Sequence, residues 1–121
     1  MTTATGHTEA IPASRVIGTN VYNTAGEHIG DIEDVMLEKT SNGIMFAVIG
    51  FGGFLGIGEK YHAIPWAALD YDKGRKGYVV PYDKEQLRAA PAYSINELTE
   101  DDGLKARDAS YSYYKADPYW Q

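Results

Sequence analysis

Short apolar stretches separated by turn residues run through the middle of the chain and predict strands joined by hairpins. The run 44–49 is apolar at every position, so we expect it to form the central and most buried strand. The predicted strands lie within residues 16–22, 29–37, 44–49, 61–66 and 78–82, with tight turns at 23–26, 40–43 and 73–77. About six short strands connected in this way favour a mainly β fold, a small six-stranded antiparallel barrel.

The second predicted strand breaks its own alternation. Continuing the pattern backwards from Val35 and Leu37 would place Asp31 and Glu33 on the core face. One extra residue near 32–34 would return both carboxylates to water, so the sequence predicts a β-bulge there.

Helical signals come late in the chain. Asp83 with Gln86, and Ser94 with Glu97, have the spacing of capping boxes and predict two short helices. Farther on, one helical face carries Leu104, Arg107, Tyr111 and Tyr114. We therefore expect an N-terminal arm at 1–13, a barrel domain at 14–93, and a helical, aromatic-rich C-terminal extension at 94–121.

Composition supports a β-rich chain and narrows the class of partner. Thirteen Gly and ten Tyr fit aromatic strands with tight turns, and the net charge of -6 disfavours nucleic acid and anionic lipid as partners. The chain has no Cys, no signal-like segment and no apolar run long enough to span a membrane. We expect a cytoplasmic protein that does not insert into membranes.

The glycine-rich stretch 50–58 does not fit a phosphate-binding fingerprint, because the required glycine and lysine positions carry other residues and a strand follows it. The same stretch presents large apolar side chains on a loop, namely Phe51, Phe54, Leu55 and Ile57. These side chains either plug one end of the barrel or form an interface with a partner.

His62 alternates with Ile64 and Trp66, which places its ring on the core-facing side of a strand. A hydrogen-bonded core histidine is the favoured interpretation, and the alternative is a ligand-binding role shared with Trp66. No spacing singles out a catalytic triad or a pair of metal-binding histidines, so we expect no catalytic residue, no metal site and no cofactor.

The chain closes on a run of large aromatic residues, including Tyr111, Tyr114, Tyr119 and Trp120. Such side chains lower solubility if they stay exposed. They can pack on the barrel's own flank or on a partner, and we favour packing that involves a second subunit.

Several short motifs occur between residues 14 and 93, namely Val16-Ile17-Gly18, Asn23–Glu27, Gly30–Val35, Gly53–Lys60 and Ile64-Pro65-Trp66. With these motifs residues 14–93 closely resemble the PRC-barrel domain family, and Leu87–Pro91 and Tyr93 are similar to its closing segment. The resemblance implies a compact six-stranded barrel of the kind found in the reaction-centre H subunit, in ribosome-maturation factors and in small stand-alone bacterial proteins. Members of the family serve assembly and protein contact and are not known as catalysts.

Two departures limit what the resemblance implies. The chain has neither the transmembrane helix of the H subunit nor the second domain of the ribosome-maturation factors, so neither role transfers. His62 stands where an aliphatic residue is more usual, and the aromatic tail lies beyond the similar region. The sequence thus predicts a non-enzymatic interaction module that contacts itself, as a homodimer or higher oligomer, or an unidentified protein. The alternative is a sensory barrel that binds a small ligand or metal.

Overall fold

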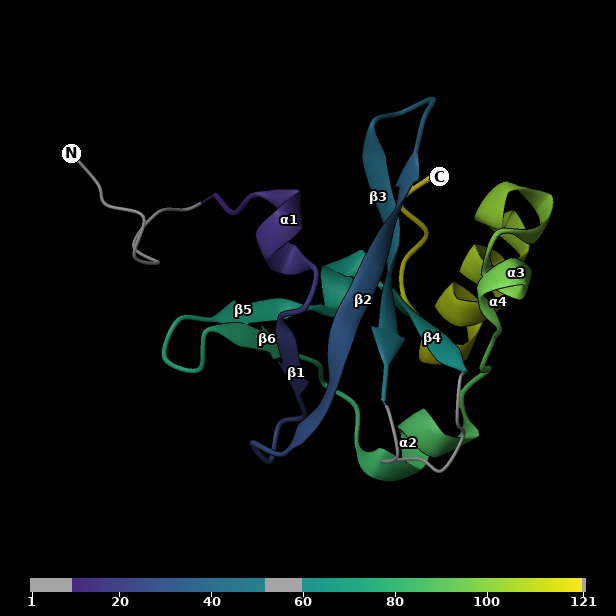
Figure 1. Cartoon of the computed structure of the whole chain (residues 1–121). Coiled ribbons are helices and arrows are strands. Elements are labelled where there is room, and N and C mark those ends of the chain that lie inside the picture. Colours follow the sequence, from purple (N-terminus) through teal and green to yellow (C-terminus); the bar gives the residue numbers. More distant parts are fainter. Residues whose placement is uncertain (1–9, 52–59, 121) are drawn as a thin grey trace.

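A computed structural model describes residues 10–51 and 60–120 as a curved sheet flanked by short helices (Figure 1). The strands are β1 (Asn20–Tyr22), β2 (His28–Glu38), β3 (Gly43–Gly50), β4 (Tyr61–Pro65), β5 (Asp70–Asp72) and β6 (Gly77–Val79). The α-helices are α1 (Ala13–Val16), α2 (Lys84–Ala89), α3 (Ile95–Leu98) and α4 (Leu104–Tyr114), and the 3-10 helices are η2 (Trp66–Ala68) and η3 (Glu100–Gly103).

The six strands form one mixed sheet in the order β4-β3-β2-β1-β6-β5. The prediction of a wholly antiparallel, closed barrel was therefore wrong in two respects. β1 and β6 pair in parallel, Val21 opposite Tyr78, and no pairing joins β4 to β5 within the described residues. Gly77 permits the close approach, because a Cβ atom there would lie 2.6 Å from the carbonyl oxygen of Asn20.

The start of the fold also differs from the prediction. Val16 was expected in a strand, but it ends helix α1, whose first turn is set by Pro12 with a φ of -70°. The Pro12 carbonyl accepts hydrogen bonds from the amides of Arg15 and Val16. Val16 is buried, and its side chain packs in the core from the end of this helical turn.

The predicted bulge in β2 is confirmed, since the register with β3 shifts between Ile32 and Asp34. Ile32 is buried while Glu33 and Asp34 are exposed, so the extra residue returns carboxylates to water. A second shift, between Met36 and Leu37, leaves Met45 and Phe46 packed in the same hydrophobic cluster.

Strand β3 is buried on both faces, as its continuous apolar run predicts. Ala47 and Ile49 pack in a cluster with residues of β1, β6 and α2, whereas Phe46 and Val48 pack in a second cluster on the opposite face. That second face is covered by the C-terminal helices through Leu98 and Ala106. The helices α3 and α4 are thus an additional layer on the sheet, visible at the right of Figure 1.

Both predicted capping boxes are present. The Asp83 side chain accepts from the Gln86 amide at the start of α2, and the Ser94 hydroxyl accepts from the Glu97 amide at the start of α3. In each case the third residue returns a side-chain hydrogen bond to the cap backbone.

Candidate interaction surface

The expected loop site is only partly within the described residues. Phe51 is 5% exposed and packs edge-on against the His62 ring, with ring centroids 4.7 Å apart. Its side chain therefore belongs to the core of the chain. Phe54, Leu55 and Ile57 lie outside the described residues.

His62 lies on β4 opposite Ile49 and is 1% exposed, on the core side as its alternation predicts. Neither ring nitrogen has a hydrogen-bond partner among the described residues, so the expected hydrogen bond of the ring is not found there. Burial lowers the pKa of His62 from 6.5 to about 4. The ring is therefore neutral at pH 7, and Trp66, its expected companion, packs on Tyr78 instead.

Two tyrosines of α4 pack on their own chain. Tyr111 is buried and donates a hydrogen bond of 2.8 Å to the Met45 carbonyl, at a point on β3 beyond the end of β4. Tyr114 stacks on Tyr82 with ring centroids 4.3 Å apart. Burial raises the pKa of Tyr111 to about 12 and raises that of Tyr114 further, so both hydroxyls stay protonated.

Residues 116–120, which follow α4, fold back along this helix and form a segment that we call the strap. The Arg107 guanidinium carbon lies 3.6 Å from the centroid of the Trp120 ring, and the Asp108 carboxylate accepts hydrogen bonds from the same guanidinium. Tyr119 donates a hydrogen bond of 2.6 Å to Glu38 at the end of β2. The tail thus has partners within its own chain and needs no second subunit to pack.

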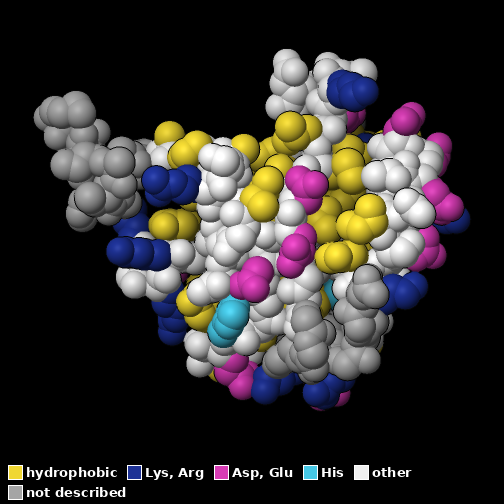
Figure 2. All heavy atoms as spheres, in the orientation of Figure 1, with side chains coloured by type: hydrophobic (Ala, Val, Ile, Leu, Met, Phe, Trp, Pro, Cys, Tyr) yellow, Lys and Arg dark blue, Asp and Glu magenta, His cyan; other side chains and the backbone are white. Residues whose placement is uncertain are grey.

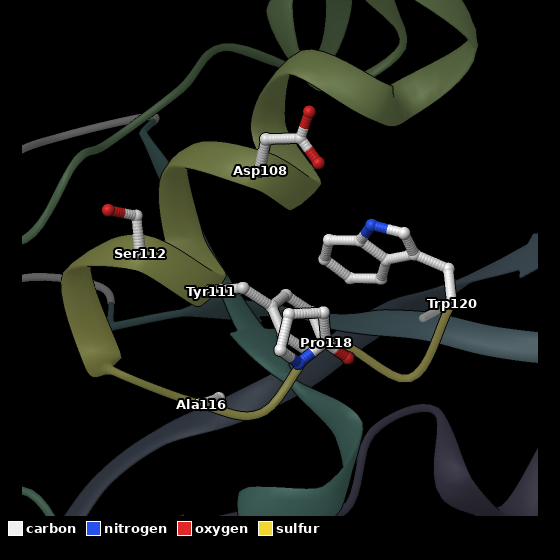
Figure 3. A pocket seen from close by; sticks show the side chains of 6 residues that line it. All are labelled: Asp108, Tyr111, Ser112, Ala116, Pro118 and Trp120. Carbon is white, nitrogen blue, oxygen red and sulfur yellow. The ribbon is translucent and has the colours of Figure 1, made fainter.

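A shallow hollow of about 310 Å³ lies between α4 and the strap. In Figure 3, Asp108 on α4 and Trp120 on the strap face each other across it. Its lining consists of Asp108, Tyr111, Ser112, Ala116, Pro118 and Trp120. The charge of Asp108 is matched by Arg107, which also occupies one face of the indole, so the hollow presents no free charged group of its own.

Exposed large apolar side chains occur elsewhere, at positions that the sequence reasoning did not single out. Leu37 on β2 is 60% exposed and Ile17 after α1 is 44% exposed. Figure 2 shows hydrophobic side chains over α1 and beside the upper part of β2, with acidic side chains among them. Leu37 could have been noticed in the sequence, because it continues the alternating apolar pattern of β2 to the end of the strand, where the core no longer covers it.

The upper part of β2 has an open edge. Strand β1 pairs with β2 only as far as Asp31, and Gly18 and Thr19 add backbone hydrogen bonds with Ile32. From Val35 to Leu37 no described residue pairs with this side of the strand. The Val35 amide instead donates a hydrogen bond of 2.8 Å to the carboxylate of its neighbour Asp34.

The described residues hold no group of three or more His, Cys, Asp or Glu side chains that could bind a metal ion. No helix among them has the length and apolar character required to cross a membrane. What the surface offers is an exposed strand edge, exposed apolar side chains and carboxylates, which are features that bind polypeptides.

Comparison with known proteins agrees with the sequence resemblance. The family model of the PRC-barrel domain matches residues 8–87. The curated proteins contain no match to the chain.

Proposed function

The chain belongs to the PRC-barrel domain family, and from this premise we propose that it is a non-enzymatic protein-interaction module that also associates with copies of itself. The observation that carries the proposal is the exposure of two large apolar side chains, Leu37 at 60% and Ile17 at 44%. Covering an exposed leucine with a protein surface lowers the free energy, because it removes apolar area from water.

The aromatic strap is not the contact surface in this proposal. Tyr111 is already buried and Trp120 is already stacked on Arg107, so a partner would have to displace contacts that the chain makes itself. The exposed residues Ile17 and Leu37 need no such displacement. They replace the strap as the expected contact residues.

The test is the solution mass of the full chain, measured by light scattering behind size exclusion over a range of concentrations. We expect a mass above that of one chain, which Leu37→Ser and Ile17→Ser return towards the monomer. Ile95→Ser is the matched control, because Ile95 is 53% exposed but lies on α3. A monomer at every concentration rejects self-association, and an oligomer that only Ile95→Ser disrupts rejects the surface.

A second candidate function, a barrel that binds a small ligand or metal, is favoured by one observation. His62 has two buried ring nitrogens without a hydrogen-bond partner among the described residues, and a ligand could supply one. A ligand that binds the folded chain raises its melting temperature. We would screen zinc, nucleotides and tetrapyrroles. A shift in the native chain that is absent in His62→Leu supports this candidate, and no shift rejects it for these ligands.

A further inference from the structure

We propose that the open edge of β2, residues 34–38, is a docking site for an extended segment of a partner protein in which basic residues alternate with apolar ones. The inference rests on the proposed interaction function and names the partner's chemistry. The segment would add a strand to the sheet beside β2, a mode of recognition in which backbone hydrogen bonds supply much of the affinity.

The backbone geometry comes from the pairing of β2 with β3. Val35 lies opposite Ala47 and Leu37 opposite Ile44. The Val35 amide bonds to a side chain, so it faces away from β3, and alternation along an antiparallel strand gives Leu37 the same orientation. Two residues therefore turn their amides and carbonyls towards the unpaired side.

The two faces of this stretch differ in chemistry. Val35 packs against the cluster shared with β1 and β6, and Leu37 continues the same face into solvent. On the other face Met36 packs under the C-terminal layer, flanked by the carboxylates of Asp34 and Glu38. An added strand would thus have apolar side chains beside Leu37 and charged side chains beside the carboxylates.

The sign of the charge on the partner follows from the acidic residues. Neither Glu33 nor Asp34 forms an ion pair with any described residue. The hydrogen bond from Tyr119 lowers the pKa of Glu38, which keeps that carboxylate charged. Lys39 in the following turn is the neighbouring base. Lysine or arginine on the incoming strand would offset this negative field, and acidic residues would add to it.

A second copy of the chain fits the same edge less well. Two copies of β2 could pair antiparallel and symmetrically. The register in which the outward amides and carbonyls of Val35 and Leu37 are hydrogen-bonded in both copies places Met36 opposite Met36 of the other copy. That register places Asp34 opposite Glu38 of the other copy at both ends, and like charges directly opposite each other destabilise a strand pair. The bulge and the carboxylates thus oppose edge-to-edge self-pairing while leaving the edge open to a basic strand.

The binding test uses a short acetylated peptide of alternating lysine and valine and its counterpart with glutamate for lysine. We expect the lysine peptide to bind with an affinity that falls as salt is raised, and the glutamate peptide to bind at least about tenfold more weakly. The double variant Glu33→Gln with Asp34→Asn should weaken the lysine peptide about threefold to tenfold. Equal binding of both peptides, or of neither, overturns the proposal.

The location test measures amide hydrogen exchange. The lysine peptide should slow exchange at Val35 and Leu37 and leave Met36, whose amide faces β3, unchanged. Leu37→Pro removes the outward amide and should abolish binding, whereas Leu37→Ala keeps that amide and should reduce binding only in part. If Leu37→Pro does not fold, the exchange pattern alone decides. Protection at other strands, or at Val35 and Leu37 without peptide in an oligomer, overturns the proposal.

The two proposals fail separately. A monomeric chain that binds the lysine peptide at this edge rejects self-association and supports the basic-strand site. An oligomer whose mass falls in Leu37→Ser but which binds neither peptide supports self-association and rejects the basic-strand site.

Discussion

Arg107 and Trp120 hold the end of the chain against helix α4, with the guanidinium carbon 3.6 Å from the centroid of the indole ring. Arg107 is only 8% exposed, so water hardly reaches its guanidinium group. The cation–π contact with the indole ring helps to stabilise this buried charge. Trp120 also meets the edge of Tyr111, with ring centroids 4.9 Å apart. These contacts of the strap with α4 therefore contribute to the stability of the fold.

Replacement of Trp120 with Ala should lower the free energy of unfolding by about 1–3 kcal/mol, since it removes a cation–π contact and an aromatic contact together. Urea unfolding followed by circular dichroism measures this. Tyr119→Phe is the matched control, because it keeps the aromatic ring and removes only the polar contacts of the hydroxyl, with Glu38 and with Arg107, and should cost at most about 1 kcal/mol. Equal stability of Trp120→Ala and the native chain would contradict the role of the strap.

The hydroxyl of Tyr111 is expected to matter more than that of Tyr113. Tyr111→Phe leaves the buried Met45 carbonyl without this donor and should cost about 1–2 kcal/mol. Tyr113 donates to the Gln86 carbonyl in an exposed setting, where water can replace the hydroxyl, so Tyr113→Phe should cost a few tenths of a kcal/mol. The same unfolding measurement compares them, and a larger loss in Tyr113→Phe would reverse the assignment.

His62 should make stability depend on pH. Burial lowers its pKa from 6.5 to about 4, so the unfolded chain binds more protons than the folded chain between these values. The free energy of unfolding should therefore be unaffected by His62 above about pH 6.5. It should fall as the pH is lowered towards 4, by up to about 3 kcal/mol in all.

His62→Leu should remove this loss and, by replacing an unpartnered polar ring, raise stability at pH 7 by about 1 kcal/mol. Melting temperatures of the variant and the native chain between pH 4 and 7 give the comparison. His28→Gln, at a histidine whose side chain is 51% exposed, is the control and should leave the slope in place. An unchanged slope in His62→Leu would show that His62 does not cause it.

Two consecutive aspartates before α4 have left-handed backbone conformations, with φ of 54° at Asp101 and 55° at Asp102. Glycine adopts this region without the steric cost of a Cβ atom, so Asp102→Gly should raise the free energy of unfolding by about 0.5–1 kcal/mol. Lys105→Gly, within α4, is the control and should lower it by about 1 kcal/mol. Destabilisation by both changes would mean that the Asp102 side chain makes interactions that stabilise the fold.

Local chemistry made much of the fold predictable. The bulge at Ile32 to Asp34 follows from a clash between alternation and charge, and the capping boxes at Asp83 and Ser94 follow from side-chain reach within one helical turn. The burial of β3 follows from its unbroken apolar run. Each of these needs only neighbours in sequence.

Relations between distant segments could not be predicted in the same way. Nothing in the three residues of β1 indicates that Val21 will lie beside Tyr78 in a parallel pair, because pairing direction depends on how the chain between them returns. The strand Asp70–Asp72 was missed because it is short and polar at both ends. The open edge of β2 depends on where β1 stops pairing, which the sequence of β2 does not record.

The double burial of β3 makes the sheet depend on the C-terminal helices. The family model ends at residue 87, before the helices that cover Phe46 and Val48. A gene fragment cut at that boundary would encode a sheet whose central strand presents two large apolar side chains to water, and such sheets self-associate through the uncovered face. We therefore expect the sheet and its C-terminal helices to unfold together, in one cooperative transition.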